Sequence, residues 1–227
     1  MFENVLAIDT ALGACSVGVL CGDDFFQEQE VMSRGQAEAL LPMVKRVMAA
    51  ASLGYQDLEA IIVTLGPGSF TGVRVGISAA KAFGMALDIP VYGMNSFDAL
   101  RLGVREGQRT LCVLESKREE FFVQSFYDDK SFPQHTMICS SRIKETVFSC
   151  DDDLVIVGDG GIRLQDEFGE NDLNHIIFSN QYYPSTKDMG LALQKSPQGP
   201  YVTSDISAFY LRGADVSVSK SVQRILA

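Results

Sequence analysis

Residues 65–76 read LGPGSFTGVRVG and join two apolar segments of the chain. The preceding segment, Ile61–Thr64, is short and entirely β-branched, which is typical of a buried strand. The following segment, residues 70–87, is long enough for a helix, and Ser69 is a favourable N-cap for it. The run therefore predicts a strand, a tight turn and a capped helix.

The turn contains two glycines, Gly66 and Gly68, which permit backbone conformations and close approaches that other residues do not. With Ser69 at the helix start they form a potential anion cradle, because the first N–H groups of a helix lack partners within it. The same residues fit a tight turn that holds no ligand equally well. The GK[ST] that ends a Walker A loop does not follow, and the glycines lack the GxGxxG spacing of dinucleotide sites.

Asp9 ends an earlier apolar segment. It either contacts a metal–nucleotide or, as we prefer, orders its own loop.

The composition fits one large domain or two lobes, since the chain has 227 residues, of which 46% are hydrophobic. A net charge of −10 argues against nucleic-acid binding by the chain alone, which would need a basic surface. We expect a cytoplasmic protein. No run of about eighteen uncharged apolar residues occurs that could span a membrane, and no basic leader occurs. Five cysteines without a CxxC pair fit free thiols in a reducing compartment. The two histidines, His135 and His175, are too far apart for an HExxH zinc motif, so no metal site is expected.

The order of the predicted elements suggests two similar lobes. In the first half we expect strands at 5–8, 16–20, 25–31, 61–64 and 91–94 and helices at 36–53, 70–87 and 96–102. In the second half we expect strands at 110–114, 121–126, 136–139, 154–157 and 176–178 and helices at 140–148, 160–164 and 186–194. Each half thus reads loosely as βββαβαβα, with a polar boundary near 103–109. We predict an α/β protein of two lobes, residues 1–103 and 104–227, each a mixed sheet with helices, as in actin, Hsp70 and sugar kinases.

The helix predicted at 70–87 is apolar over more of its circumference than contact with one sheet requires. Small residues recur at every fourth position: Gly72, Gly76, Ala80 and Gly84. Such a row lets another backbone approach closely, although each internal glycine costs about 1 kcal/mol of helix propensity. We infer that this helix and the one before it pack on the sheet with one side and on a second protein with the other. The alternative is that the C-terminal half of the chain covers them.

Longer stretches of the sequence resemble the TsaB (YeaZ) family, which belongs to the bacterial machinery for N6-threonylcarbamoyladenosine in tRNA. The resemblance rests on LAIDTALGACSVGVL at 6–20, RGQAEALLPMV at 34–44 and VTLGPGSFTGVRVGISAAKAFGMALDIPVYGMNSFDAL at 63–100. Weaker echoes are LCVLESKREEFFVQSF at 111–126, VGDGG at 157–161 and AFYLRGADV at 208–216. The chain departs from the family pattern at two places. Gln36 replaces a frequent histidine, and Glu115-Ser116-Lys117 replaces the usual DAR.

The resemblance implies a two-lobed actin-like (ASKHA) fold and a non-catalytic subunit, with no catalytic residue and no metal ligand of its own. The expected partners are the catalytic paralogue TsaD, which this subunit holds and activates, and the ATPase TsaE. A homodimer is implied when the subunit is alone, and contact with tRNA only through the complex. No cofactor is expected to bind tightly. ATP or ADP is compatible with the shared interface, and the candidate contacts are Asp9, Gly66, Gly68 and Ser69.

The same resemblance implies that the first two helices of the N-terminal lobe form the contact with the partner. The implied interface residues are Ala39, Met43, Ala50, Gly72, Val73, Gly76, Ile77 and Ala80, with Arg74 and Lys81 at the rim.

Two other functions stay open. An ATP-dependent small-molecule kinase of the same superfold would use Asp9 as its acid and needs a second phosphate loop, for which only Gly158-Asp159-Gly160-Gly161 is available. A peptidase, an activity attached to relatives of this family, finds no nucleophile signature or metal set here. The pattern places no pair of carboxylates in one cleft. We expect Asp159 to serve its turn structurally.

Overall fold

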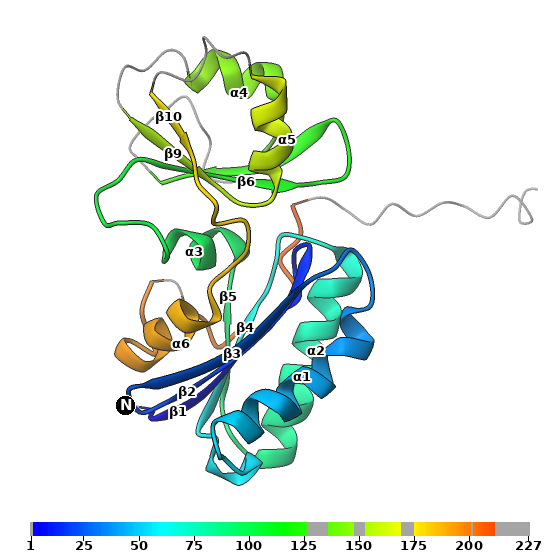
Figure 1. Ribbon diagram of the computed structural model, residues 1–227, viewed down its shortest axis with the longest axis vertical. Coiled ribbons are helices and arrows are strands. Elements are labelled where there is room, and N and C mark those ends of the chain that lie inside the picture. The colour runs from blue at the N-terminus through cyan, green and yellow to red at the C-terminus, as the bar shows by residue number, and fades with distance from the viewer. Residues whose placement is uncertain (1, 127–135, 148–152, 169–174, 201, 212–227) are drawn as a thin grey trace, which may run out of the picture.

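The computed structural model describes residues 2–126, 136–147, 153–168, 175–200 and 202–211. Two five-stranded sheets form two lobes, one above the other in Figure 1. The first sheet has the order β3-β2-β1-β4-β5 and the second the order β10-β9-β6-β7-β8. The first sheet consists of β1 (Asn4–Asp9), β2 (Ala14–Cys21), β3 (Asp24–Val31), β4 (Ala60–Thr64) and β5 (Val91–Met94). The second consists of β6 (Thr110–Glu115), β7 (Glu120–Ser125), β8 (Thr136–Cys139), β9 (Leu154–Val157) and β10 (Ile176–Phe178).

The two sheets repeat one topology. In each sheet, the first three strands along the chain are antiparallel to one another. The fourth strand pairs in parallel with the first, and the fifth pairs in parallel with the fourth. The helices are α1 (Gln36–Ala50), α2 (Phe70–Leu87), α3 (Ser96–Arg101), α4 (Ser140–Val147), α5 (Gly160–Glu167) and α6 (Thr186–Lys195), with a 3₁₀ turn, η1, at Tyr55–Asp57. The predicted two-lobed α/β fold of the actin-like class is confirmed.

Strand β1 is buried on both sides, because its side chains alternate between two helical layers. Leu6 and Ile8 belong to the apolar cluster beneath α1 and α2. Val5 and Ala7 belong to the opposite cluster, which includes Met189 and Leu193 of α6. Figure 1 shows α1 and α2 on one face of this sheet and α6 on the other. Helix α6 of the C-terminal half therefore covers the first sheet on the face away from α1 and α2.

Residues 202–211, called here the C-terminal strap, also return to the first lobe. Thr203 exchanges two backbone hydrogen bonds with Gly93, at 2.8 and 3.0 Å. The Phe209 N–H then donates to the Leu65 carbonyl at 2.7 Å. The predicted division into residues 1–103 and 104–227 places α6 and the strap with the second lobe, whereas both pack on the first. Within the described residues, no helix combines the length and apolar character needed to cross a bilayer.

The predicted cap of α2 is present: the Ser69 hydroxyl accepts a hydrogen bond from the Gly72 N–H at 3.3 Å. Replacing Ser69 by alanine should lower the free energy of unfolding by about 1 kcal/mol, because one N–H of the first turn loses its acceptor. Urea denaturation measures this loss. Ser78→Ala, an exposed change within the same helix, is the control and should leave stability unchanged or slightly raised. Equal effects of the two changes would contradict the capping role.

Candidate functional site

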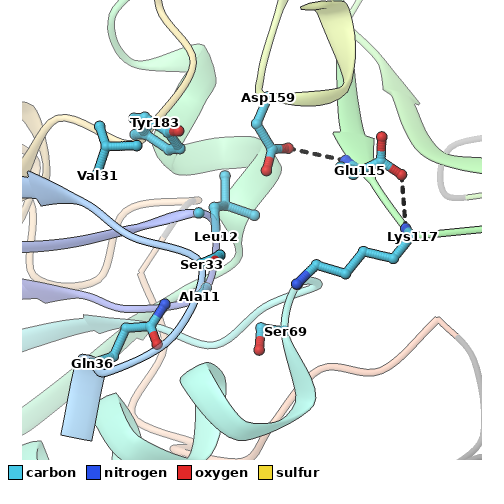
Figure 2. A pocket seen from close by; sticks show the side chains of 12 residues that line it. Ala11, Leu12, Val31, Ser33, Gln36, Ser69, Glu115, Lys117, Asp159 and Tyr183 are labelled. Atoms are coloured by element: carbon cyan, nitrogen blue, oxygen red, sulfur yellow. Dashed lines mark hydrogen bonds between the residues drawn. The ribbon is translucent and has the colours of Figure 1, made fainter. Parts of the chain in front are cut away.

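A cavity of about 260 Å³ lies where the turns of the two lobes meet (Figure 2). The first lobe lines it with the β1–β2 turn, the end of β3, the start of α1 and the start of α2. The second lobe lines it with the β6–β7 turn, the start of α5 and the segment before α6. The lining residues are Ala11, Leu12, Gly13, Val31, Ser33, Gln36, Gly68, Ser69, Glu115, Lys117, Asp159 and Tyr183. We call this the inter-lobe cavity.

Asp9 lies behind this cavity and is fully buried. Its Oδ1 accepts hydrogen bonds from the Thr64 hydroxyl at 2.6 Å and from the Ala11 N–H at 3.1 Å. Among the described residues, its Oδ2 has no hydrogen-bond partner. Burial raises the pKa of Asp9 to about 6, although the two hydrogen bonds oppose the shift. These contacts tie β1 to β4 and fix the β1–β2 turn, which is the loop-ordering role that the sequence interpretation preferred.

The glycine turn before α2 packs tightly against the chain itself. A Cβ on Gly68 would lie 2.1 Å from the Ala11 carbonyl oxygen, so only glycine fits there. Gly66 has a φ of +94° and lies against the Phe209 carbonyl of the strap. The Ser69 N–H donates to the Ala11 carbonyl at 2.7 Å, so this group of the predicted anion cradle already has an acceptor. Gly68 and Ser69 line the cavity, whereas Asp9 and Gly66 are not among its lining residues.

Asp159 lies opposite the turn of the first lobe and accepts a hydrogen bond at Oδ1 from the Glu115 N–H at 2.9 Å. Burial raises its pKa to about 6, and the nearby charges of Glu115 and Asp9 act in the same direction. Two carboxylates, Glu115 and Asp159, line the cavity together, which corrects the expectation that no pair of carboxylates lies in one cleft. The signal in the sequence was that each lies at or just after the end of a short apolar strand, β6 and β9.

The β6–β7 turn is held in place by an ion pair. Arg163 of α5 donates to the Glu115 carboxylate from Nε at 2.9 Å and from Nη2 at 3.1 Å. The same carboxylate accepts from the Lys117 N–H at 2.7 Å. Lys117 adopts a positive φ of 58°, and its side chain reaches across the cavity towards Ser69 (Figure 2). The turn therefore presents one ammonium group to the cavity, opposite the carboxyl of Asp159.

The cavity can hold a small polar molecule, since an ammonium group, a carboxyl and several hydroxyls surround it. Among the described residues, its lining contains neither histidine nor cysteine, so no Ser–His or Cys–His pair stands there. The segment Gly158-Asp159-Gly160-Gly161, which a kinase would need as its second phosphate loop, serves in packing. A Cβ on Gly158 would lie 2.4 Å from the Val113 carbonyl oxygen, so this turn needs glycine to pack on β6. In the part of the chain that the structure describes, no group of three or more His, Cys, Asp or Glu could hold a metal ion.

The glycine row of α2 points inwards, and the prediction that it faces a second protein is wrong. A Cβ on Gly72 would lie 2.1 Å from the Thr10 carbonyl oxygen, and one on Gly76 would lie 2.5 Å from the Thr10 hydroxyl. The row therefore lets α2 approach the chain's own sheet. Six of the predicted interface residues are buried inside the first lobe for this reason: Met43, Gly72, Val73, Gly76, Ile77 and Ala80.

The other predicted interface residues lie nearer the surface: Ala50, Arg74 and Lys81 are exposed, and Ala39 is half-buried. Sequence reasoning missed three large apolar side chains on the same helices. Met85 is 86% exposed, Leu41 56% and Phe70 50%. These residues point away from the sheet, on the surface that we call the outer face of α1 and α2. The sequence could have revealed those on α2, because they fall on the side of the helix opposite to the glycine row.

Comparison with known proteins places this geometry in a family. Residues 27–150, more than half of the chain, match the model of TsaD, described as tRNA N6-adenosine threonylcarbamoyltransferase. The TsaB protein of Buchnera aphidicola (subsp. Schizaphis graminum), a tRNA threonylcarbamoyladenosine biosynthesis protein, is 24% identical over 199 residues, 83% of this chain and 92% of its own length. The chain belongs to the family that the TsaD model describes, and within that family to the TsaB/YeaZ group.

The chain is also similar to proteins without an assigned role and to a solved structure. An uncharacterized protein of Mycobacterium leprae is 42% identical over 129 residues, which cover 55% of this chain and 35% of that protein. Three further mycobacterial relatives are covered over 60% of their length, so the match spans less than two thirds of these proteins. The structure of YeaZ from Pseudomonas aeruginosa has the same fold, with a TM-score of 0.75 and 22% identity over 92% of this chain and 100% of that one.

Both departures of this TsaB/YeaZ chain from the family pattern lie in the inter-lobe cavity. Gln36 lines it from the start of α1, and its side-chain amide donates to the Met32 carbonyl at 3.1 Å. Glu115 and Lys117 line it from the β6–β7 turn. The lining of the cavity is thus the part of the fold where this family member differs from the expected sequence.

Proposed function

We propose that this TsaB/YeaZ chain takes part in tRNA threonylcarbamoyladenosine biosynthesis as a cytoplasmic, non-catalytic subunit. In this proposal it binds a threonylcarbamoyltransferase of the TsaD family through the outer face of α1 and α2 and works with a TsaE-like ATPase. Contact with tRNA runs through the complex, because the chain carries a net charge of −10. The names of the relatives support the pathway, and the features of the outer face support the mode of action.

The observation that carries the proposal is the exposure of large apolar side chains on a two-helix surface. Met85 and Leu41 expose 86% and 56% of their surface on neighbouring helices of one layer. Apolar side chains gathered on one face are typical of sites for protein–protein contact. Alanines on the same outward sides, such as Ala49 and Ala82, leave the surface flat enough for a partner helix to approach.

A non-catalytic role is supported by the inter-lobe cavity. Asp9, the acid that a kinase would need, is committed to Thr64 and Ala11 and does not line that cavity. Gly158 and Gly160 of the second loop are used in packing on β6. A homodimer in the absence of the transferase follows from the same outer face, and binding of ATP or ADP in the complex stays a prediction.

Met85→Asp tests the surface. We expect wild-type protein to co-elute with the TsaD-family transferase of the same organism in size-exclusion chromatography. The variant should lose at least about tenfold in affinity by calorimetry, because a desolvated carboxylate replaces an apolar contact. Its free energy of unfolding should stay within about 0.5 kcal/mol of wild type, since Met85 is exposed.

Ile162→Asp is the matched control, since Ile162 is an exposed apolar residue on α5 of the second lobe. It should bind the transferase as wild type does. Separate elution of the wild-type chain and the transferase at micromolar concentration would refute the proposed function. Normal binding by Met85→Asp would refute this surface.

A further inference from the structure

The C-terminal strap brings an aromatic residue to the outer face of α2. Its backbone is fixed to the first lobe by Thr203 and by Phe209, whose side chain packs on the apolar cluster beneath the helices. The next residue, Tyr210, lies beside Phe70 at the start of α2, with ring centroids 5.7 Å apart. The strap thus adds a residue from the end of the chain to a surface formed by its first hundred residues.

Arg74 of α2 completes this group. Its Cζ lies 3.2 Å from the centroid of the Phe70 ring and 5.2 Å from that of Tyr210, and its Nη1 donates to the Phe70 carbonyl at 3.3 Å. Phe70 remains 50% exposed and Tyr210 39%. We call these three residues the aromatic–arginine cluster. Because the rings hold the guanidinium in place, Arg74 loses little side-chain freedom when it binds a further group.

The two helices are basic on an acidic chain. They carry four cations, Lys45, Arg46, Arg74 and Lys81, against one carboxylate, Glu38. Arg46 is paired with Glu28 of β3 at 2.6 Å. Within the described residues, no carboxylate lies within ion-pair distance of Lys45, Arg74 or Lys81. Counting the described residues alone, the outer face therefore offers three cations without an ion-pair partner, although the chain has a net charge of −10.

We propose that the aromatic–arginine cluster anchors the partner protein by binding a carboxylate of an acidic segment on the partner's surface. This inference rests on the proposed function and names the chemistry of its contact. Charge complementarity calls for an acidic group opposite Arg74. Leu41 and Met85 on the same face favour a protein over a nucleic acid, since a phosphate backbone leaves such apolar side chains uncovered. A second copy of the chain would offer Arg74 a face whose two helices carry a single carboxylate, Glu38, so an acidic segment of another protein is the better match.

Calorimetry with the TsaD-family transferase at 50 and 300 mM salt tests the cluster. Arg74→Glu should weaken binding at least tenfold at low salt, because it places two carboxylates together. Tyr210→Ala should weaken binding about threefold to tenfold, because it removes one of the two rings that hold Arg74. Wild-type affinity should fall with salt, and the affinity of Arg74→Glu should fall less. Lys187→Glu is the control: this exposed lysine lies on α6, on the opposite face of the first sheet, and should bind as wild type does.

The outcomes separate the two levels of the proposal. If the wild-type chain does not bind the transferase, the proposed function fails together with this inference. If wild type binds and both Arg74→Glu and Tyr210→Ala bind equally well, the cluster is not the anchor, and the proposed function stands. If Arg74→Glu fails to fold by circular dichroism, Tyr210→Ala decides alone. If Arg74→Glu instead lowers the affinity of the isolated chain for tRNA and leaves transferase binding intact, the occupant is a nucleic acid and the inference is overturned.

Discussion

Gly72→Ala is expected to destabilise the first lobe by about 3 kcal/mol, although alanine is the better helix former. The new Cβ would lie 2.1 Å from the Thr10 carbonyl oxygen, and the carbon of that carbonyl would be 3.2 Å away. Backbone at the end of β1 cannot move aside easily, because Asp9 and Thr10 are held by hydrogen bonds to Thr64 and to Gly72 itself. Overpacking of this kind outweighs the gain in helix propensity of about 1 kcal/mol.

Gly190→Ala provides the matched control within the same lobe. Gly190 lies inside α6, and its nearest neighbour to a new Cβ would be the Leu20 Cβ at 3.6 Å, an ordinary contact. This change should leave stability unchanged or raise it by up to about 1 kcal/mol. Guanidinium denaturation of both variants measures the difference. If Gly72→Ala were as stable as Gly190→Ala, α2 would not be seated against β1 in the way described.

The order of the elements could be predicted from the sequence because it depends on local patterns. Ser69 caps α2 as predicted, and β4 ends where its β-branched run ends, because both depend on neighbouring residues only. The buried character of β1 is equally local: its apolar side chains face helices on both sides, so the strand reads as a continuous apolar run. Patterns within ten or twenty residues were sufficient for these features.

The orientation of α2 did not follow, because it depends on a residue far away in the chain. A row of small residues at every fourth position is compatible with a foreign backbone or with the chain's own sheet. The deciding neighbour is Thr10, whose hydroxyl donates to the Gly72 carbonyl at 2.7 Å across 62 positions of sequence. The inward glycine row also locates the outer face, since Phe70, Arg74 and Met85 must then point away from the sheet.

The effect of the Asp9 charge on Asp159 could not be predicted from the sequence for the same reason, because the two residues belong to different lobes. The strap is a third case. Nothing in the periodicity of residues 202–211 indicates that Thr203 pairs with Gly93 or that Tyr210 reaches Phe70. The parts of the candidate sites that sequence reasoning missed are thus those where one lobe, or the end of the chain, meets another element.

The contribution of Asp9 to stability is expected to fall as the pH rises from about 4 to about 7. Burial raises the pKa of Asp9 from its ordinary value of 3.8 to about 6, so the folded chain binds this proton more tightly than the unfolded chain does. The stabilisation is therefore complete below pH 3.8 and is lost as the pH rises through about 6. A shift of about two units corresponds to about 3 kcal/mol.

Asp9→Asn isolates this effect, because the amide oxygen can still accept from Thr64 and Ala11 while the titrating group is removed. Relative to wild type, the variant should gain about 3 kcal/mol in free energy of unfolding between pH 4 and pH 7.5. Urea denaturation of both proteins at both pH values measures how the difference in their free energies of unfolding changes with pH. Any cost of the new amide that does not depend on pH cancels in this comparison. Asp166→Asn, an exposed change on α5, is the matched control for the loss of one carboxylate.

Asp159 makes the prediction sharper, because the negative charge of Asp9 is one of the causes that raise its pKa to about 6. In Asp9→Asn the pKa of Asp159 should therefore move down towards its ordinary value, which a carboxyl-detected NMR titration can follow. The two measurements test different causes: the stability change reports the burial of Asp9, and the Asp159 titration reports the charge of Asp9. A stability difference that did not change with pH would contradict the burial of Asp9, and an unmoved Asp159 titration would contradict the action of the Asp9 charge across the two lobes.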